Sequence, residues 1–260
     1  VKKRTVDGTV SELGSNFIWP KGIDLNNAGE VFVADFGAGE IKKIGTDNNV
    51  TILMAGLGAP TTLESDGLQD VAVGPEGHVY ATYKEENTAW ILKMTDQGRD
   101  AFGELCSVEF ENCVISWSTL DPRGIDVTVD GTVYVADHSN DVAVTKLTPS
   151  SSGMYTSSSV ASESFGATGL QVSANGVVFV NDNSTSVIKT INLSGMVNEV
   201  PNANWSQDFP ELRGLALATN GDLYVTKVSW EGESQTSSIV KLSATPDNTS
   251  CSSAEFAFYE

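Results

Sequence analysis

The sequence predicts an all-β protein built from repeated four-stranded units, and three observations support this prediction. The first is a segment that recurs along the 260-residue chain with glycine, apolar and acidic residues in a similar order. The second is the alternation of apolar and polar residues within each copy, which is the period expected of strands. The third is the Asp-Gly or Asn-Gly dipeptide inside several copies, which accepts the positive φ angles of tight hairpin turns.

The recurring segment begins with a short strand in which a glycine, or once an aspartate, precedes alternating residues. Its five copies place the following residues at the same position: Gly22, Asp70, Gly124, Gly169 and Gly214. The intervals between them are 48, 54, 45 and 45 residues. Intervals of this length are typical of repeat architectures. We expect the repeats to start near residues 20, 68, 122, 167 and 212.

Three further strands are predicted in each copy. A turn such as "TVDGT" at 128–132 leads into a second strand rich in β-branched and aromatic residues, such as "TVYVAD" at 132–137. A third strand, such as "SVIKTI" at 186–191, follows a polar loop, and the fourth is less regular. An aspartate closes the second strand in three copies, where its carboxylate is expected to fix the next turn by accepting backbone N–H groups. These aspartates are Asp35, Asp137 and Asp182.

Four-stranded units of this length cannot bury both faces alone, but stacking them around an axis buries each face against a neighbour. The prediction is therefore an all-β propeller of four-stranded blades in one domain over residues 1–260, with six blades favoured and five as the alternative. A β-sandwich would give no reason for the regular repeat. Residues 1–19 are predicted to form a partial blade, because 1–14 read like the third and fourth strands at 41–56.

The repeat pattern P-x-G-I-x-V, D/N-G-x-V-Y-V-A-D and I-K-K-I resembles that of the NHL-repeat propellers. It is also similar to a wider six-bladed group that includes gluconolactonase-like and strictosidine-synthase-like proteins. The resemblance implies the fold but not one chemistry, because this group contains binders, scaffolds, lyases and hydrolases. In gluconolactonase-like enzymes a divalent metal is held partly from the position before the repeat glycine. Here Lys21, Arg123 and Arg213 occupy that position, and their charges would repel a metal.

The chain is strongly acidic, with 34 acidic and 15 basic residues and a formal net charge of −19. Such a charge repels phosphate backbones, so nucleic-acid binding is not expected. No apolar run is long enough for a membrane span. The pair Cys106 and Cys113, in "CSVEFENC", is close enough in sequence to form a disulfide. Together with several N-x-S/T sequons, this pair favours a secreted or extracellular protein.

The residue before the repeat glycine is the main candidate for ligand binding, because it should lie at one mouth of the central channel. The five residues there are Lys21, Gln69, Arg123, Thr168 and Arg213. Three cations at one repeat position of an acidic protein predict a pocket for a carboxylate, a sulfate or an acidic side chain. The alternative is that they only balance nearby acids such as Asp121 and Glu211.

A second candidate site uses the polar residues that alternation places towards the channel, namely Asp24, Asp126 and Gln171. Their oxygen atoms suit Ca²⁺, which makes calcium the one candidate cofactor, although ordered water is the alternative. Only two histidines occur, so a three-histidine zinc site is excluded by count. His78 and His138 are both predicted to lie in exposed loops.

No catalytic constellation is evident, so the favoured function is a binding or scaffold module for a protein or glycan ligand. One alternative is a calcium-dependent lactonase or hydrolase of the gluconolactonase-like group. Another is a structural subunit, in which the surplus half-blade pairs with a second copy or is completed by another chain segment.

Overall fold

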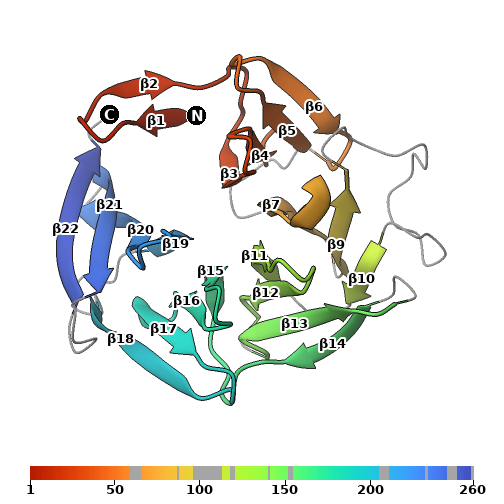
Figure 1. Ribbon diagram of the computed structural model, residues 1–260, viewed down its shortest axis with the longest axis vertical. Helices are drawn as coiled ribbons and strands as arrows, with labels where there is room; N and C mark the ends of the chain where they lie inside the picture. The colour runs from red at the N-terminus through yellow and green to blue at the C-terminus, as the bar shows by residue number, and fades with distance from the viewer. Residues whose placement is uncertain are drawn as a thin grey trace. The chain divides into compact units, whose positions relative to one another are not determined.

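The computed structural model describes residues 1–58, 66–86, 88–95, 113–117, 121–139, 141–151, 155–204, 211–231, 234–244 and 251–258. Within these residues the strands form five four-stranded sheets, here called blades, and one two-stranded hairpin. Figure 1 labels the strands in chain order. The chain divides into two compact units, of which the first holds strands β1–β10 and the second strands β11–β22. None of the described helices is long and apolar enough to cross a membrane.

The first unit contains the hairpin and two blades. The hairpin pairs β1 (Lys2–Arg4) with β2 (Val10–Glu12). The first blade is β3 (Pro20–Leu25), β4 (Val31–Asp35), β5 (Glu40–Ile44) and β6 (Val50–Met54). The second is β7 (Gly67–Val73), β8 (Val79–Glu85), β9 (Thr88–Met94) and β10 (Cys113–Trp117), with a short 3-10 helix at Pro75–Gly77.

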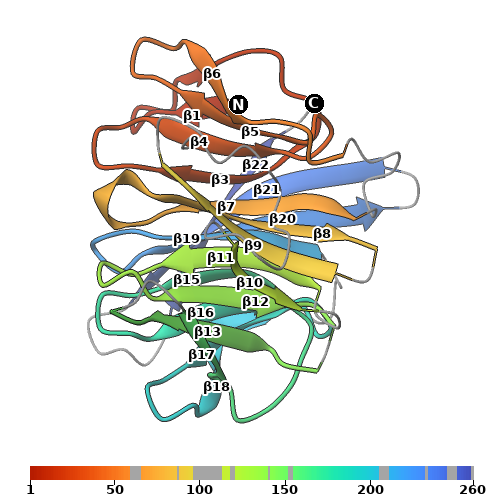
Figure 2. The same cartoon turned by 90° about the vertical axis from the view of Figure 1, so that its right-hand side faces the viewer.

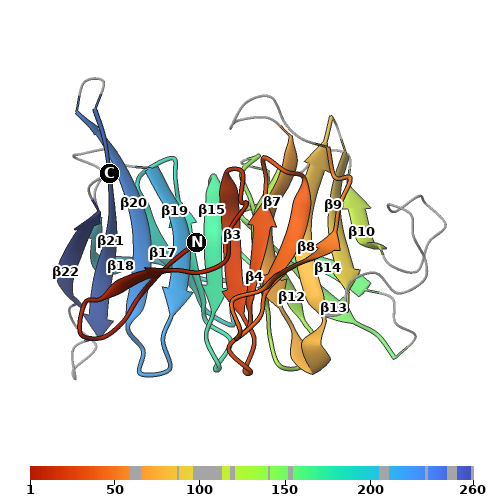
Figure 3. The same ribbon diagram turned by 90° about the horizontal axis from the view of Figure 1, so that it is seen from above.

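The second unit contains three blades. The third blade is β11 (Pro122–Val127), β12 (Val133–Asp137), β13 (Val144–Pro149) and β14 (Tyr155–Ser159). The fourth is β15 (Ala167–Val172), β16 (Val178–Asp182), β17 (Val187–Ile191) and β18 (Val197–Asn204). The fifth is β19 (Glu211–Leu217), β20 (Leu223–Glu231), β21 (Ser234–Ala244) and β22 (Cys251–Phe258), in which β20 and β21 are drawn as a long pair (Figure 3).

The first strands of the five blades begin at Pro20, Gly67, Pro122, Ala167 and Glu211, and the strand order in every blade follows the chain. The preferred number of six blades is wrong for the described residues, which form five, the predicted alternative. The fifth blade has its own fourth strand, β22, so it leaves no place for the N-terminal strands. The strands at 1–19 instead form the separate β1–β2 hairpin. The prediction of a single domain stays a prediction.

The hydrophobic core lies between consecutive blades of each unit. In the first unit Phe32 and Ala34 of β4 pack against Val71 of β7, and Figure 2 shows β3 and β7 side by side. In the second unit Tyr134 of β12 packs against Leu170 of β15. The rule is that the second strand of one blade covers the first strand of the next.

Glycine is required where consecutive first strands approach each other. A Cβ at Gly169 would lie 2.4 Å from the carbonyl oxygen of Arg213, and one at Gly124 would lie 2.4 Å from that of Thr168. In the first unit, a Cβ at Gly22 would lie 2.5 Å from the Cα of Asp70. These contacts are with backbone atoms that cannot move aside. The glycine recurs because a Cβ atom would clash with the neighbouring first strand, and not because the position needs a positive φ angle.

We expect Gly169→Ala to lower the melting temperature, because the added methyl group must push β19 away from β15, at a cost of about 1–3 kcal/mol. Gly214→Ala is the matched control: among the described residues, a Cβ there meets only the side chain of Thr226, at 3.3 Å. Thermal unfolding followed by circular dichroism checks both variants. Equal losses in the two variants would show that the close approach does not explain the repeat glycine.

Candidate functional site

In the first unit, the position before the repeat glycine holds an interacting pair. Lys21 Nζ donates to Gln69 Oε1 at 2.8 Å, so the two adjacent blades are joined through the predicted ligand-binding residues. The same ammonium group lies 3.5 Å from the centre of the buried Phe36 ring, a cation–π contact. Lys21 is therefore held in place by protein groups on two sides.

In the second unit, the same position forms a row of three neighbouring residues, Arg123 on β11, Thr168 on β15 and Arg213 on β19. We call this set the β11–β19 row. The close approach at the two repeat glycines, described above, places the backbones of consecutive members next to each other. Thr168 Oγ1 also donates to the carbonyl oxygen of Leu212 at 3.0 Å. The structure therefore brings together three of the five predicted ligand-binding residues within one unit.

Each arginine of the β11–β19 row pairs with an acid two residues earlier. Arg123 Nη2 lies 2.9 Å from Asp121 Oδ2, and Arg213 forms an ion pair with Glu211. The predicted alternative, that the cations balance these acids, is thus confirmed as a contact. A guanidinium group has five N–H bonds, which is more than a single ion pair with a carboxylate occupies. The Arg213 side chain is 58% exposed and that of Arg123 is 25% exposed, so Arg213 is the more accessible cation.

The three predicted calcium ligands share one contact: a side-chain oxygen accepts a backbone N–H from the first strand of the next blade. The bonds are Val73 N to Asp24 Oδ2 (2.7 Å), Val172 N to Asp126 Oδ2 (2.6 Å) and Leu217 N to Gln171 Oε1 (3.3 Å). The other carboxylate oxygen of each aspartate accepts the N–H of the following residue. These oxygens therefore join consecutive first strands.

This arrangement does not favour a metal. Carboxylates that accept backbone N–H groups through both oxygens have fewer lone pairs directed at an ion. The described residues also contain no group of three His, Cys, Asp or Glu side chains that could hold one. Calcium binding at Asp24, Asp126 and Gln171 stays a prediction. So does the disulfide, because Cys106 lies outside the described residues.

Two aspartates have pKa values shifted in opposite directions. Burial raises the pKa of the Asp24 carboxyl above its ordinary value of 3.8, against the effect of the N–H groups of Val73 and Leu25. Hydrogen bonds from Lys241 and Asn220 lower the pKa of Asp222 below 3.8. The contribution of Asp24 to stability is thus full below 3.8 and is lost as the pH rises through its folded pKa. The contribution of Asp222 is full above 3.8 and is lost as the pH falls through its folded pKa.

We expect Asp24→Asn and Asp222→Asn to change the pH dependence of stability with opposite signs. Between about pH 3 and about pH 7, the melting temperature of Asp24→Asn relative to the unmodified protein should rise with pH, and that of Asp222→Asn should fall. Melting curves at several pH values give both slopes. Slopes of the same sign would contradict the assignment of these two shifts.

Two of the three aspartates that close the second strands have the predicted structural role, and Asp35 fixes a different segment, the one before the first strand of its blade. Asp137 Oδ1 accepts the N–H of Ser139 at 2.8 Å, and Asp182 Oδ1 accepts that of Ser184 at 3.0 Å, both in the loop that follows. Asp35, which is also fully buried, accepts the N–H of Ile18 at 2.8 Å. The bonds therefore fix the loops at the ends of these strands.

Two of these aspartates each pair with a lysine of the third strand, of which Lys42 is buried and Lys189 is partly buried. Lys42 Nζ lies 2.6 Å from Asp35 Oδ2, and Lys189 Nζ lies 3.0 Å from Asp182 Oδ2 at the equivalent place in the fourth blade. Burial opposes the charge of Lys42, but the hydrogen bonds that its ammonium group donates to Asp35 and Glu40 outweigh this effect and raise the pKa of the ammonium group. In the third blade the equivalent position, opposite Val135, is Thr145.

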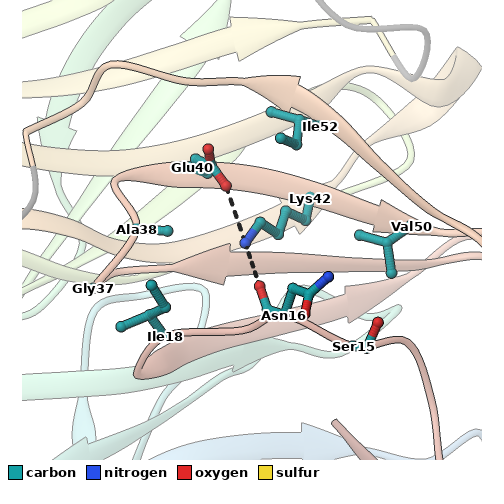
Figure 4. Close-up of a pocket in the computed structure, with 9 residues that line it drawn as sticks. All are labelled: Ser15, Asn16, Ile18, Gly37, Ala38, Glu40, Lys42, Val50 and Ile52. Atoms are coloured by element: carbon teal, nitrogen blue, oxygen red, sulfur yellow. Dashed lines mark hydrogen bonds and ion pairs between the residues drawn. The ribbon is translucent and has the colours of Figure 1, made fainter.

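Lys42 lies in a cavity of about 560 Å³ on the first blade. Figure 4 shows its ammonium group between Glu40 and the backbone oxygen of Asn16, at 3.0 and 2.7 Å. The apolar part of the lining comes from Ile18, Val50 and Ile52. Sequence reasoning missed this cavity, because the segment at 15–18 lies between repeats and has no pattern that indicates what it covers.

We expect Lys42→Met to destabilise the protein by about 3–5 kcal/mol, because Asp35 would remain buried without its cation. Adding Asp35→Asn to this variant should recover part of the loss. The control is Lys84→Met, whose partner Asp66 lies 3.4 Å away at a more exposed site, with an expected loss of about 1 kcal/mol or less. Chemical unfolding measures all three, and an equal loss at Lys42 and Lys84 would contradict the structural role.

The two histidines are half-buried, so the prediction that they are exposed is wrong. His138 donates its backbone N–H to the carbonyl oxygen of Asp121 at 2.9 Å, which places it near the β11–β19 row. Its Nδ1 atom is buried with no hydrogen-bond partner among the described residues. His78 Nδ1 lies 3.1 Å from the carbonyl oxygen of Pro75 in its own turn. No sequence pattern would have indicated the position of His138, because it depends on the contact between two loops.

Five four-stranded antiparallel blades, packed face to face within each unit, define an all-β propeller fold. No protein-family model matches the chain. No curated protein matches it significantly.

Among solved structures, the chain is similar to several β-propeller proteins. Virginiamycin B lyase from Staphylococcus aureus has 18% identity and a TM-score of 0.61, covering 98% of this chain and 76% of the lyase. Aldose sugar dehydrogenase from Streptomyces coelicolor, in its PQQ-bound form, has 15% identity and a TM-score of 0.62, covering 95% and 83%. A gluconolactonase from Xanthomonas campestris has 14% identity and a TM-score of 0.63, covering 87% and 75%. At these identities the likeness shows the fold alone.

Proposed function

We propose that this chain is a binding module that recognises an acidic group of a protein or glycan ligand at the β11–β19 row. The observation that carries the proposal is the placement of Arg123, Thr168 and Arg213 at the start of three neighbouring strands, with Arg213 the most exposed. Arginine suits this role, because its planar group binds a carboxylate or a sulfate through two parallel hydrogen bonds. Thr168 adds a hydroxyl group between the two cations.

The charge of the whole protein makes this row selective. A net charge of −19 repels anions in general. An acidic ligand therefore binds only where local cations and hydrogen bonds outweigh this repulsion. Asp121 and Glu211 orient the guanidinium groups by taking one hydrogen bond each. An acidic ligand would therefore meet first the exposed guanidinium group of Arg213, whose orientation Glu211 sets. The expected result is a specific contact with marked salt dependence.

The sequence supports two finer parts of this proposal, namely the type of repeat and the extracellular setting. The arrangement of glycine, first strand, turn and V-Y-V-A-D strand resembles that of the NHL-repeat propellers, and the wider group of such propellers includes binders and scaffolds. The cysteine pair and the sequons favour a secreted or extracellular setting, in which protein and glycan ligands with carboxylate or sulfate groups are available.

We expect the double variant Arg123→Ala and Arg213→Ala to weaken binding of an acidic ligand at least tenfold. A panel of sulfated and uronic-acid glycans and of acidic peptides provides the probes, and the best binder is then measured by calorimetry at two salt concentrations. Lys146→Ala, a cation on the third strand of the third blade, is the matched control and should keep the affinity. Absence of binding across the panel, or an equal loss in the control, would contradict the proposal.

A calcium-dependent lactonase is the second candidate, supported by the likeness in fold to the gluconolactonase. It requires Asp24, Asp126 or Gln171 to give up backbone bonds to reach an ion. Calcium-dependent turnover of a lactone, abolished by a chelator, would favour it over the binding module. Unchanged melting curves with chelator and with added calcium, together with no turnover, would exclude it.

A further inference from the structure

The β1–β2 hairpin reproduces the outer half of a blade residue by residue. Its pairs Lys2↔Glu12, Lys3↔Ser11 and Arg4↔Val10 have the same register as the pairs of β5 and β6. Those pairs are Lys42↔Ile52, Lys43↔Thr51 and Ile44↔Val50. The hairpin therefore consists of the third and fourth strands of a blade.

The turns of the two hairpins also match. The N–H of Thr5 donates to the carbonyl oxygen of Thr9 at 2.9 Å, as the N–H of Gly45 does to that of Asn49 at 2.8 Å. In both turns an aspartate, Asp7 or Asp47, accepts the N–H two residues later at 3.1 Å. Identical turns and register show that the N-terminal strands fold as one repeat element rather than as a loose end.

The hairpin packs on the first blade as the outer half of a preceding blade would. Val1 and Leu13 contact the cluster of Val31, Val33 and Ile44. Their equivalents in the first blade, Ile41 and Leu53, pack in the same way against the second blade. The outer half of the interface is therefore filled.

The inner half of that interface is uncovered. On the first strand of the first blade, Ile23 is 51% exposed and Leu25 is 60% exposed. The counterparts of Ile23 in the second and fourth blades are covered by the second strand of the preceding blade, so Val71 is 2% exposed and Leu170 is 3% exposed. No second strand covers Ile23, and among the described residues β1 pairs only with β2 (Figure 1). An apolar face thus lies beside a strand, β1, that pairs with one strand only among the described residues.

We infer that this face is a docking site for a β-hairpin with the pattern of the repeat's own first two strands. Such a hairpin would pair its second strand with the open edge of β1 and cover Ile23 and Leu25, completing a blade. A second copy of this chain does not fit, because within the described residues every such strand pair is already part of a blade. The inference is independent of the proposed function of the β11–β19 row.

One charged residue defines the occupant further. Lys2 has the register position of Lys42, and Lys42 and Lys189 each bind the aspartate that ends the second strand of their blade. Lys2 is exposed at the edge of the docking face. The docked strand therefore ends in an aspartate, as in the V-Y-V-A-D strand of the third blade.

The test adds a synthetic peptide with the sequence of residues 122–137, labelled for fluorescence anisotropy, to the full chain. We expect saturable binding, a higher melting temperature and slower hydrogen exchange at Lys2–Arg4. Ile23→Asp should weaken binding at least tenfold while its own melting temperature stays unchanged, because Ile23 is already exposed. A peptide carrying the equivalent of Asp137→Asn should bind several-fold more weakly.

Leu193→Asp is the matched control, since Leu193 is also exposed but lies in a turn of the fourth blade; it should keep full affinity. A scrambled peptide should not bind. If Ile23→Asp proves unstable, protection of Lys2–Arg4 in the unmodified chain still decides the question. No binding, or protection only elsewhere, overturns the inference. A dimer found by light scattering and dissociated by Ile23→Asp also overturns it, since the face would then hold a second copy.

Discussion

The close approach of consecutive first strands is the constraint on which the rest of this structure depends. A glycine without a side chain lets the two backbones meet, and two residues later a side-chain oxygen accepts an N–H from the neighbouring strand. The glycine removes a steric barrier and the oxygen supplies a direct bond, so the two act together. Apolar residues of the second strands can then cover the next blade, because the spacing between the blades has been set.

The same constraint positions the candidate site. The residue before each glycine is carried at the point of closest approach, so Arg123, Thr168 and Arg213 become neighbours although 45 residues separate each from the next. The acids that precede the arginines then hold the guanidinium groups in defined orientations. At these contacts Asp24 and Asp126 accept backbone N–H groups of the next blade, so the carboxylates predicted to bind calcium also join consecutive first strands.

Much of the fold was predictable, because one sequence pattern occurs five times and every copy predicts the same order of strands and turns. The turns, the second strands and the structural role of Asp137 and Asp182 followed from local chemistry. The preferred number of six blades failed for a specific reason. Residues 1–14 do read as half a blade, and they fold as one, but no strand pair joins them among the described residues. A local pattern specifies an element, whereas completing a blade requires a partner from elsewhere.

The sequence by itself determined the repeat, the strand order within each blade and the residues that occupy the position before the glycine. Those properties depend on side-chain alternation and turn chemistry, which act over a few residues. Only the tertiary structure decided which side chains meet: Lys21 with Gln69, His138 near Asp121, and Ile23 left without a cover. Such contacts depend on which blades pack together, and burial against a neighbour is not encoded in the period of a single strand.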